Sequence, residues 1–315
     1  MLSTFLAVML FTAGAQAQTY PSKTITFVVP FAAGSATDGL GRALAQEVAK
    51  EAGQNVIVEN KPGANGFIAA QAAAQAAPDG HTVFITTNTT QSANPHLFKK
   101  LPYDPVKDFA PVTALAKGYQ IMVVNPKLPV NSVPDVIAHA KKNPGKLTFG
   151  AGSSSSRVAV ELFQQMTGTQ LVHVPYKSNP LAITDLIGGQ VDLMIVDVAT
   201  GLPQVQGGKL KGLAVTSRQR SPLVPDLPTI DEAGVKGYEM SYWFGAYVPA
   251  KTPEPVIKRL HDLLVKAVAA EPVKKFIANT GMEPFTTTPQ ELAKFQATET
   301  EQWGRIIKAA GIQPE

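Results

Sequence analysis

Two short loops in this sequence have the residue types that suit the binding of a small anion. Phe31–Asp38 and Gly150–Arg157 each follow an apolar, strand-like segment and precede a helical pattern. Both consist mainly of Gly, Ala, Ser and Thr, and such small residues let a ligand approach the backbone closely. The free N–H groups and the dipole of a helix N-terminus attract negative charge. Two such loops at the carboxyl ends of parallel strands predict a ligand site between them.

The polar side chains of these loops also allow a purely structural interpretation. Thr37 or Asp38 could cap the helix after the first loop. Ser155 or Ser156 could do the same after the second loop. For Asp38 we favour capping or loop ordering, because the sequence shows no acid–base partner for it. For the pair of loops we favour the ligand site, because the pattern occurs twice.

Arg157 follows a run of serines at the start of the second helix. A cation beside the positive end of a helix dipole is unfavourable unless something compensates it. Arginine can bind a carboxylate through two parallel hydrogen bonds. We therefore expect Arg157 to bind the distal carboxylate of the ligand, while the Phe31–Asp38 loop holds the proximal one. The alternative is a solvated arginine in the first turn of the helix.

The motifs of common enzyme classes are missing from the sequence. It contains neither a G-x-S-x-G nucleophile elbow nor a Walker A motif. Gly39-Leu40-Gly41 begins a dinucleotide-binding motif, but Leu44 takes the place of its third glycine. The histidines are too scattered for a helical zinc motif, and the absence of cysteine excludes thiolate nucleophiles and thiolate metal ligands. We expect no catalysis, no cofactor and no bound metal.

The composition is that of an ordinary globular protein. The chain has 315 residues, of which 44% are hydrophobic and 17% charged, and this length suggests about two domains. The net charge is +4, but Lys and Arg occur mostly singly, so we do not expect nucleic-acid binding. A mild positive excess would help to attract anionic ligands by long-range steering.

The first 17 residues have features of an export signal. Leu6–Phe11 is an apolar run and Ala15-Gln16-Ala17 is a small-x-small cleavage site, although the segment lacks Lys and Arg. The run is shorter than the roughly 20 apolar residues that a bilayer span needs, and the alternative is a short buried helix. We predict export to the periplasm and cleavage after Ala17. Intact-mass analysis of periplasmic protein checks this, and a full-length cytoplasmic species would contradict it.

The remaining sequence alternates strand-like and helical patterns, as in parallel sheets covered by helices. Strands are expected at 24–30, 55–59, 81–87, 119–124, 147–150, 171–174, 191–196, 212–216 and 238–248. Helices are expected from about 40 to 52 and at 67–77, 133–142, 158–166, 181–187, 255–270, 272–280 and 289–309. The C-terminal segment that contains the last three helices has too few strands to build a sheet of its own, so we expect these helices to cover the first lobe. The result is two α/β lobes joined by two hinge crossings, near Val124–Pro126 and Ser241–Val248.

Several longer stretches carry a family resemblance in their order and spacing. They are Val29–Asp38, Val58–Gly66, Tyr103–Phe109, His173–Lys177, Gly188–Asp192 and Leu227–Gly234. With them, the chain resembles the Bug-type substrate-binding proteins of tripartite tricarboxylate transporters over roughly Tyr20–Ile312. The sequence departs from the usual family pattern in both loops. Ala33-Gly34 stands where the family usually has two glycines. The four serines and Arg157 stand where the second loop of the family is often richer in glycine. The resemblance therefore does not name the ligand.

The resemblance implies a type II periplasmic-binding-protein fold, with a carboxylate ligand in the cleft between the lobes. It implies a monomer that delivers this ligand to the membrane components of a tripartite tricarboxylate-type transporter. We expect residues 1–17 to be the signal peptide, 18–124 and 246–315 the first lobe, and 125–245 the second. The predicted ligand contacts are Phe31, Ala33, Gly34, Ser35, Ala36, Thr37, Asp38, Asn88, Thr89, Ser153, Ser154, Ser155, Ser156, Arg157, Tyr176, Asn179 and Asp197.

Two other functions compete with solute uptake at this stage. A hydrolase or transferase would need a nucleophile–base pair, which the sequence does not show. A receptor that reports the ligand to a membrane sensor would use the same clamp as an uptake protein. One further feature is open: Tyr242-Trp243-Phe244 could form a stacking wall for the ligand, but such a run beside a crossing strand is more often core.

Overall fold

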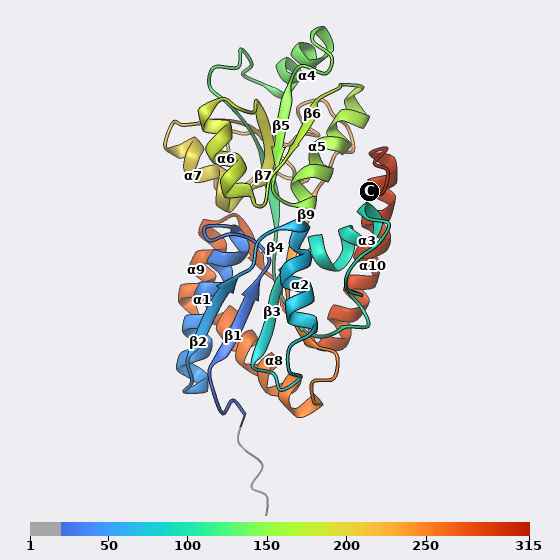
Figure 1. Ribbon diagram of the computed structural model, residues 1–315. Helices are drawn as coiled ribbons and strands as arrows, with labels where there is room; N and C mark the ends of the chain where they lie inside the picture. The colour runs from blue at the N-terminus through green and yellow to red at the C-terminus, as the bar shows by residue number, and fades with distance from the viewer. Residues whose placement is uncertain (1–19) are drawn as a thin grey trace, which may run out of the picture.

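The computed structural model describes residues 20–315, and one β-sheet runs through both of its lobes (Figure 1). The ten strands are β1 (Ile25–Val29), β2 (Val56–Asn60), β3 (Thr82–Thr87), β4 (Phe109–Val124), β5 (Thr148–Ala151), β6 (Val172–Pro175), β7 (Leu193–Asp197), β8 (Lys211–Val215), β9 (Ser241–Pro249) and β10 (Met282–Pro284). Their order is β2-β1-β3-β9-β4-β7-β5-β6, and β8 and β10 also pair with β4.

Helices cover both faces of this sheet. The α-helices of the described chain are α1 (Ala36–Ala52), α2 (Phe67–Ala74), α3 (Asn94–Leu97), α4 (Val133–Lys142), α5 (Ser154–Thr167), α6 (Asn179–Gly188), α7 (Val198–Gln206), α8 (Glu254–Ala269), α9 (Glu271–Asn279) and α10 (Pro289–Ala309). A 3₁₀ turn, η1 (Ala64–Gly66), precedes α2, and a π-helical turn, η2 (Thr89–Ala93), precedes α3. The export signal predicted over residues 1–17 lies outside the described residues.

The first lobe is built on three parallel strands, because β1 pairs in parallel with both β2 and β3. Successive side chains of a strand point to opposite faces of the sheet, so a strand with helices on both sides is apolar at nearly every position. Phe27 packs with α1, α8 and α9, whereas its neighbour Val28 packs with α2 and the start of α10. This explains the continuous apolar run that marks β1 in the sequence.

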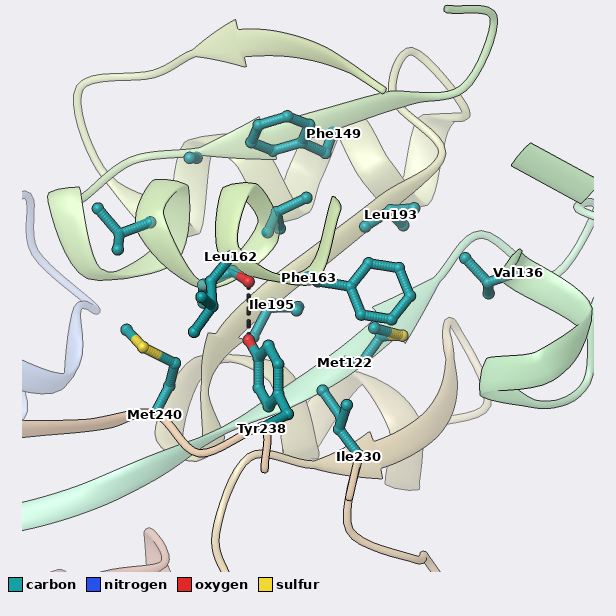
Figure 2. Close-up of a cluster of buried hydrophobic side chains, with 14 of the residues drawn as sticks. Met122, Val136, Phe149, Leu162, Phe163, Leu193, Ile195, Ile230, Tyr238 and Met240 are labelled. Atoms are coloured by element: carbon teal, nitrogen blue, oxygen red, sulfur yellow. Dashed lines mark hydrogen bonds between the residues drawn. The ribbon is translucent and has the colours of Figure 1, made fainter. Parts of the chain in front are cut away.

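The second lobe has the same layered design on β5, β6 and β7. Helices α4 and α5 cover one face of its sheet, and α6 and α7 cover the other. Figure 2 shows the core on the α5 side, where Phe163 of α5 packs among Met122, Phe149 and Ile195 from three strands. The buried hydroxyl of Tyr238 donates a hydrogen bond to the carbonyl of Ala159, 2.7 Å away, which satisfies its one polar group in this core.

Strand β4 belongs to both lobes and forms the first crossing between them. Its residues 109–119 pair with β9, and residues 120–124 pair with β7 and β8. The chain returns between β8 and β9, where the amide of Met240 bonds to the carbonyl of Thr216. The sheet pairing thus favours crossings at 119–120 and 240–241, close to the predicted ones. The lobe division at 124/125 and 245/246 stays a proposal.

The C-terminal helices cover the first lobe, but α10 also reaches the second. Helices α8 and α9 pack on α1 and so cover the first lobe, as the sequence predicted. Helix α10 packs on β4 and then on α5, and Trp303 and Ile307 near its end belong to the core of the second lobe. Figure 1 shows the C-terminus beside this lobe. No helix within residues 20–315 combines the length and the apolar character that a bilayer crossing requires.

Candidate ligand-binding site

The two predicted loops meet at one small cavity between the lobes. Predicted residues make up most of its wall: Phe31, Ser35, Ala36, Thr37, Asn88, Ser153, Ser155, Asn179 and Asp197. Thr87, Tyr242 and Phe244 complete it. The cavity volume is about 30 Å³, which is room for about two water molecules. A group of this size with two oxygen atoms, such as a carboxylate, fits the space.

Serine residues cap the helices that open at this cavity. The Ser35 side chain accepts a hydrogen bond from the amide of Asp38, and the Ser153 side chain accepts one from the amide of Ser156. The capping residues considered from the sequence were therefore wrong, since the extended backbone that a cap needs occurs two to three residues earlier. Each serine uses its oxygen as an acceptor, so the O–H group of Ser35 remains available to a ligand. Ser153 Oγ also lies 3.1 Å from Ser155 Oγ, so one of these two hydroxyls donates to the other and the second O–H group is left for a ligand.

Both helices direct their N-termini at the cavity. The first amides of a helix have no partner within it, and the caps satisfy only those of Asp38 and Ser156. The amides of Ala36 and Ser155, on the cavity wall, have no hydrogen-bond partner within residues 20–315. Free donors and the positive ends of two helix dipoles therefore converge on the same small space.

Two further donors are buried in the cavity wall. Asn88, at the end of β3, is fully buried, and its Oδ1 accepts a hydrogen bond from the amide of Trp243. Its Nδ2 has no partner in the described part of the chain, and neither has the hydroxyl of buried Tyr242. Burial, with the nearby Asp197 carboxyl, raises the pKa of Tyr242 well above its usual value, so this hydroxyl stays protonated. Because an unpaired buried donor is costly, these two groups indicate an acceptor in the cavity.

Asp38 orders the first loop rather than facing the cavity. Its carboxylate accepts hydrogen bonds from the Gly34 amide at 2.9 Å, from Asn60 Nδ2 at 3.0 Å and from the Arg42 guanidinium. Burial alone would raise the pKa of Asp38, but these bonds outweigh it and hold the pKa below its usual value. Asn60 also bonds to the carbonyl of Phe31 at 2.9 Å. The carboxylate therefore fixes the loop from behind.

A second network fixes the other loop. The Gly152 amide donates to Asn179 Oδ1 at 3.0 Å, and Asn179 Nδ2 donates to Asp197 Oδ2 at 2.9 Å. The other Asp197 oxygen accepts from the amide and the hydroxyl of Thr200. Burial raises the pKa of Asp197, and the donated bonds act in the opposite direction. Since its oxygens are already bonded, Asp197 positions Asn179 and the loop.

Comparison with known proteins places this site in a family. Residues 40–312 match the family described as "Tripartite tricarboxylate transporter family receptor". An R. palustris protein solved with adipate is 34% identical, with a TM-score of 0.90, and the match covers 94% of this chain and 100% of that one. The periplasmic binding protein BugD is 33% identical, with a TM-score of 0.88, over 94% of this chain and 100% of that one. MatC from Rhodopseudomonas palustris with bound malate is 30% identical, with a TM-score of 0.86, over 91% of this chain and 100% of that one.

The chain belongs to the tripartite tricarboxylate transporter receptor family. The Bug-type resemblance and the two-lobed periplasmic-binding-protein fold are confirmed. The family and these structures are solute-binding receptors, so the chain is a receptor and not an enzyme.

The receptor places the other predicted contacts away from the cavity wall. Ala33 and Gly34 are exposed, and Gly34 lines a separate cavity with residues of α6 and α7. Thr89 and Ser156 are buried behind the wall. Ser154 bonds through its hydroxyl to Asn94 Oδ1 at 2.9 Å and so links α5 to the first lobe. Tyr176 donates a hydrogen bond to Asp185 at the edge of a neighbouring cavity.

Arg157 also lines this second cavity, which has a volume of about 320 Å³. Its Nη1 is 2.5 Å from Oε1 of Glu315, and Glu161 lies 4.0 Å from its Nε. The sequence offered no indication of this partner, because Glu315 lies 158 positions further along the chain. Arg157 is therefore neither in the first cavity nor simply solvated.

The wall residues outside the predicted contacts come from strand ends, and the sequence had left two of them, Tyr242 and Phe244, open between ligand wall and core. Tyr242 and Phe244 of β9 face the cavity and the α1 side, and Trp243 between them packs on the opposite face. The alternation of a strand separates these three aromatic residues, which the sequence treated as one run. Thr87 is the last residue of β3 and directly precedes the predicted contact Asn88. Its place at this strand end could have identified it as a wall residue.

Acidification should destabilise the receptor partly through His173. Its ring stacks on Phe149 with centroids 5.0 Å apart, and burial, aided by Arg157, lowers its pKa to about 4. The unfolded chain takes up this proton near pH 6.5, so stability is lost as the pH falls from about 6.5 towards 4. Between pH 7 and pH 4.5, the free energy of unfolding of His173→Gln should fall by about 2 kcal/mol less than that of wild type. Urea unfolding at the two pH values measures both changes. Equal losses in the two proteins would contradict this.

Proposed function

We propose that this receptor is a periplasmic protein that captures a small organic carboxylate in the interlobe cavity and delivers it to a tripartite tricarboxylate-type transporter. One observation carries the proposal: two helix N-termini and two unpartnered donors, Asn88 Nδ2 and Tyr242 Oη, converge on a cavity the size of a carboxylate. The related proteins solved with adipate and with malate hold ligands of this class, which supports the proposal.

The electrostatics of the wall favour a singly charged group. None of the wall residues in the described chain is Lys or Arg, and Asp197 is the acidic one. A carboxylate would therefore be held by neutral donors and helix dipoles, which together suit one negative charge. A phosphate or sulfate dianion would bring its second charge close to Asp197, and like charges at short range are destabilising. The wall thus selects carboxylates over these larger anions.

A thermal-shift screen tests the proposal. The purified protein is heated with small mono- and dicarboxylates, with the corresponding amides, and with phosphate and sulfate. A ligand at 100 times its dissociation constant stabilises the folded state by about 2.7 kcal/mol. We expect stabilisation by at least one carboxylate and by none of the amides. Equal shifts with acids and amides, or stabilisation by inorganic anions alone, would contradict the proposal.

Ligand binding should also close the two lobes. The cavity wall combines residues of both lobes, such as Ser35 and Ser153, so ligand contacts to both exist only when the lobes meet. Two crossings allow the lobes to rotate relative to each other, and the end of α10, whose Trp303 and Ile307 lie in the core of the second lobe, would move with that lobe. X-ray scattering should show a smaller radius of gyration with ligand, above all in Ser154→Ala, which lacks the bond to Asn94. Profiles that stay unchanged at saturation in both proteins would contradict closure.

Export, monomeric state and delivery complete the proposal. Size-exclusion chromatography with light scattering should give the mass of one chain. Cells that lack the protein should lose uptake of the best carboxylate from the screen and regain it when wild type is restored. A variant with a disabled cavity should not restore uptake. Full uptake without the protein would contradict the transport role.

A further inference from the structure

The second cavity adjoins the first and is far larger. Ser153 lines both cavities, and their volumes are about 30 Å³ and about 320 Å³. The first has room for a carboxylate group but not for the rest of a longer acid. Ser153 caps α5 and Arg157 lies one turn further along, about 6 Å on the helix axis. A ligand that extends past Ser153 would therefore reach the Arg157 guanidinium.

The second cavity is already built to hold a carboxylate. Arg157 is mostly buried, with 18% of its side chain exposed, and Lys177 also lines the space. The guanidinium offers five N–H donors, and Nε has no hydrogen-bond partner among the residues described. The carboxylate that it does hold belongs to Glu315, 2.5 Å from Nη1.

Glu315 reaches this place from the first lobe. Its amide and carbonyl pair with the carbonyl of Leu97 and the amide of Lys99, respectively. Its side chain is 58% exposed, in contrast to the mostly buried arginine. An exposed carboxylate on a flexible side chain gains little from such a pair, so another anion can take its place at low cost.

We propose that the second cavity binds the distal carboxylate of an extended dicarboxylate on Arg157, and that this carboxylate displaces Glu315. The inference rests on the proposed function, because the proximal carboxylate occupies the first cavity. It names the preferred ligands as dicarboxylates long enough to pass Ser153. Glu315 is then an internal competitor that fills the arginine site when the ligand does not.

Calorimetry with two matched series of acids tests this proposal. The probes are the straight-chain dicarboxylates from malonate to suberate and the monocarboxylates with the same number of carbons. We expect the longer dicarboxylates to bind at least about tenfold more tightly than their monocarboxylate partners, the usual scale for one charge-assisted hydrogen bond. The shortest dicarboxylate, malonate, should show no such preference.

Substitutions at the ion pair then assign the preference to Arg157. Arg157→Gln should lower the ratio of dicarboxylate to monocarboxylate affinity by about ten- to hundredfold. Arg157→Lys should keep part of this ratio, since an ammonium keeps the charge but lacks the planar fork. Glu315→Gln should raise dicarboxylate affinity severalfold, because the competitor has lost its charge. The control is Arg220→Gln, which removes an Arg–Glu pair of 2.8 Å outside both cavities and should change nothing.

The outcomes separate this inference from the proposed function. Wild type that binds neither series would overturn the carboxylate function, and the inference with it. Wild type that binds both series equally well would leave that function standing and overturn only the inference. An undiminished preference in folded Arg157→Gln, or unchanged dicarboxylate affinity in Glu315→Gln, would likewise overturn it.

Discussion

Asn88→Asp is expected to abolish carboxylate binding, with a loss of at least about a thousandfold in affinity. The substitution keeps the oxygen that accepts the Trp243 amide, so the local backbone is retained. It replaces the unpartnered Nδ2 with an oxygen, which removes a donor and sets an acidic group against the ligand. Asn88→Leu removes the donor without adding charge and should cost less, about ten- to hundredfold.

Calorimetry with the best carboxylate from the screen measures both losses. Asn131→Asp is the matched control, because Asn131 is exposed and does not line the cavity, and the affinity of this variant should equal that of wild type. Thermal unfolding of each variant establishes that it is folded. Binding of folded Asn88→Asp within tenfold of wild type would show that this side chain does not face the ligand.

Gly152→Ala is expected to destabilise the protein by about 3 kcal/mol and to abolish binding. A Cβ at this position would lie 1.9 Å from the carbonyl carbon of Ser178 and 2.2 Å from the amide nitrogen of Asn179. These are backbone atoms, so the loop that contains Gly152 must move away from the Ser178–Asn179 segment. Separation breaks the bond from the Gly152 amide to Asn179 and moves the cap residue Ser153 away from the cavity.

The control for this glycine is Gly188→Ala in α6. A Cβ there meets no atom within 4 Å, and alanine favours the helix by up to about 1 kcal/mol. Thermal unfolding should therefore show a midpoint several degrees lower for Gly152→Ala and an unchanged or higher midpoint for Gly188→Ala. Similar midpoints for the two variants would refute the close contact between Gly152 and the Ser178–Asn179 segment.

Local features of the sequence predicted much of the fold. Apolar runs marked the strands, and glycine and proline residues marked the helix ends, as Gly53 does after α1 and Gly168 after α5. Both ligand loops were found because their small residues stand between a strand and a helix, a pattern within one short segment. Helix α4 was predicted with its observed bounds, Val133–Lys142, because Pro134 and Pro144 delimit it.

Features that depend on distant parts of the chain could not be predicted. The first half of β4 was missed because it contains Pro111 and two irregularities of register, which disturb the alternation of a strand. Helix α7 was missed because Gly201 and Pro203 interrupt its pattern. The roles of Tyr242 and Arg157 depend on partners brought in by the tertiary fold, namely the cavity wall and Glu315.

The two fixed loops suggest why the ligand site needs few charged groups. Asp38 and Asp197 each accept several hydrogen bonds from their own lobe, so neither loop has to be ordered by the ligand. Donors held in place before binding lose little entropy when the ligand arrives. We infer that neutral donors are sufficient in the first cavity because they are preorganised.

A crystal structure with the tightest carboxylate from the screen tests the central claim most directly. The account predicts a ligand carboxylate in the first cavity, with an oxygen within about 3.2 Å of Asn88 Nδ2 and further contacts to the Ser35 and Ser153 ends of the two helices. A ligand bound with its carboxylates elsewhere, and with Asn88 Nδ2 and the Tyr242 hydroxyl still unbonded, would contradict it.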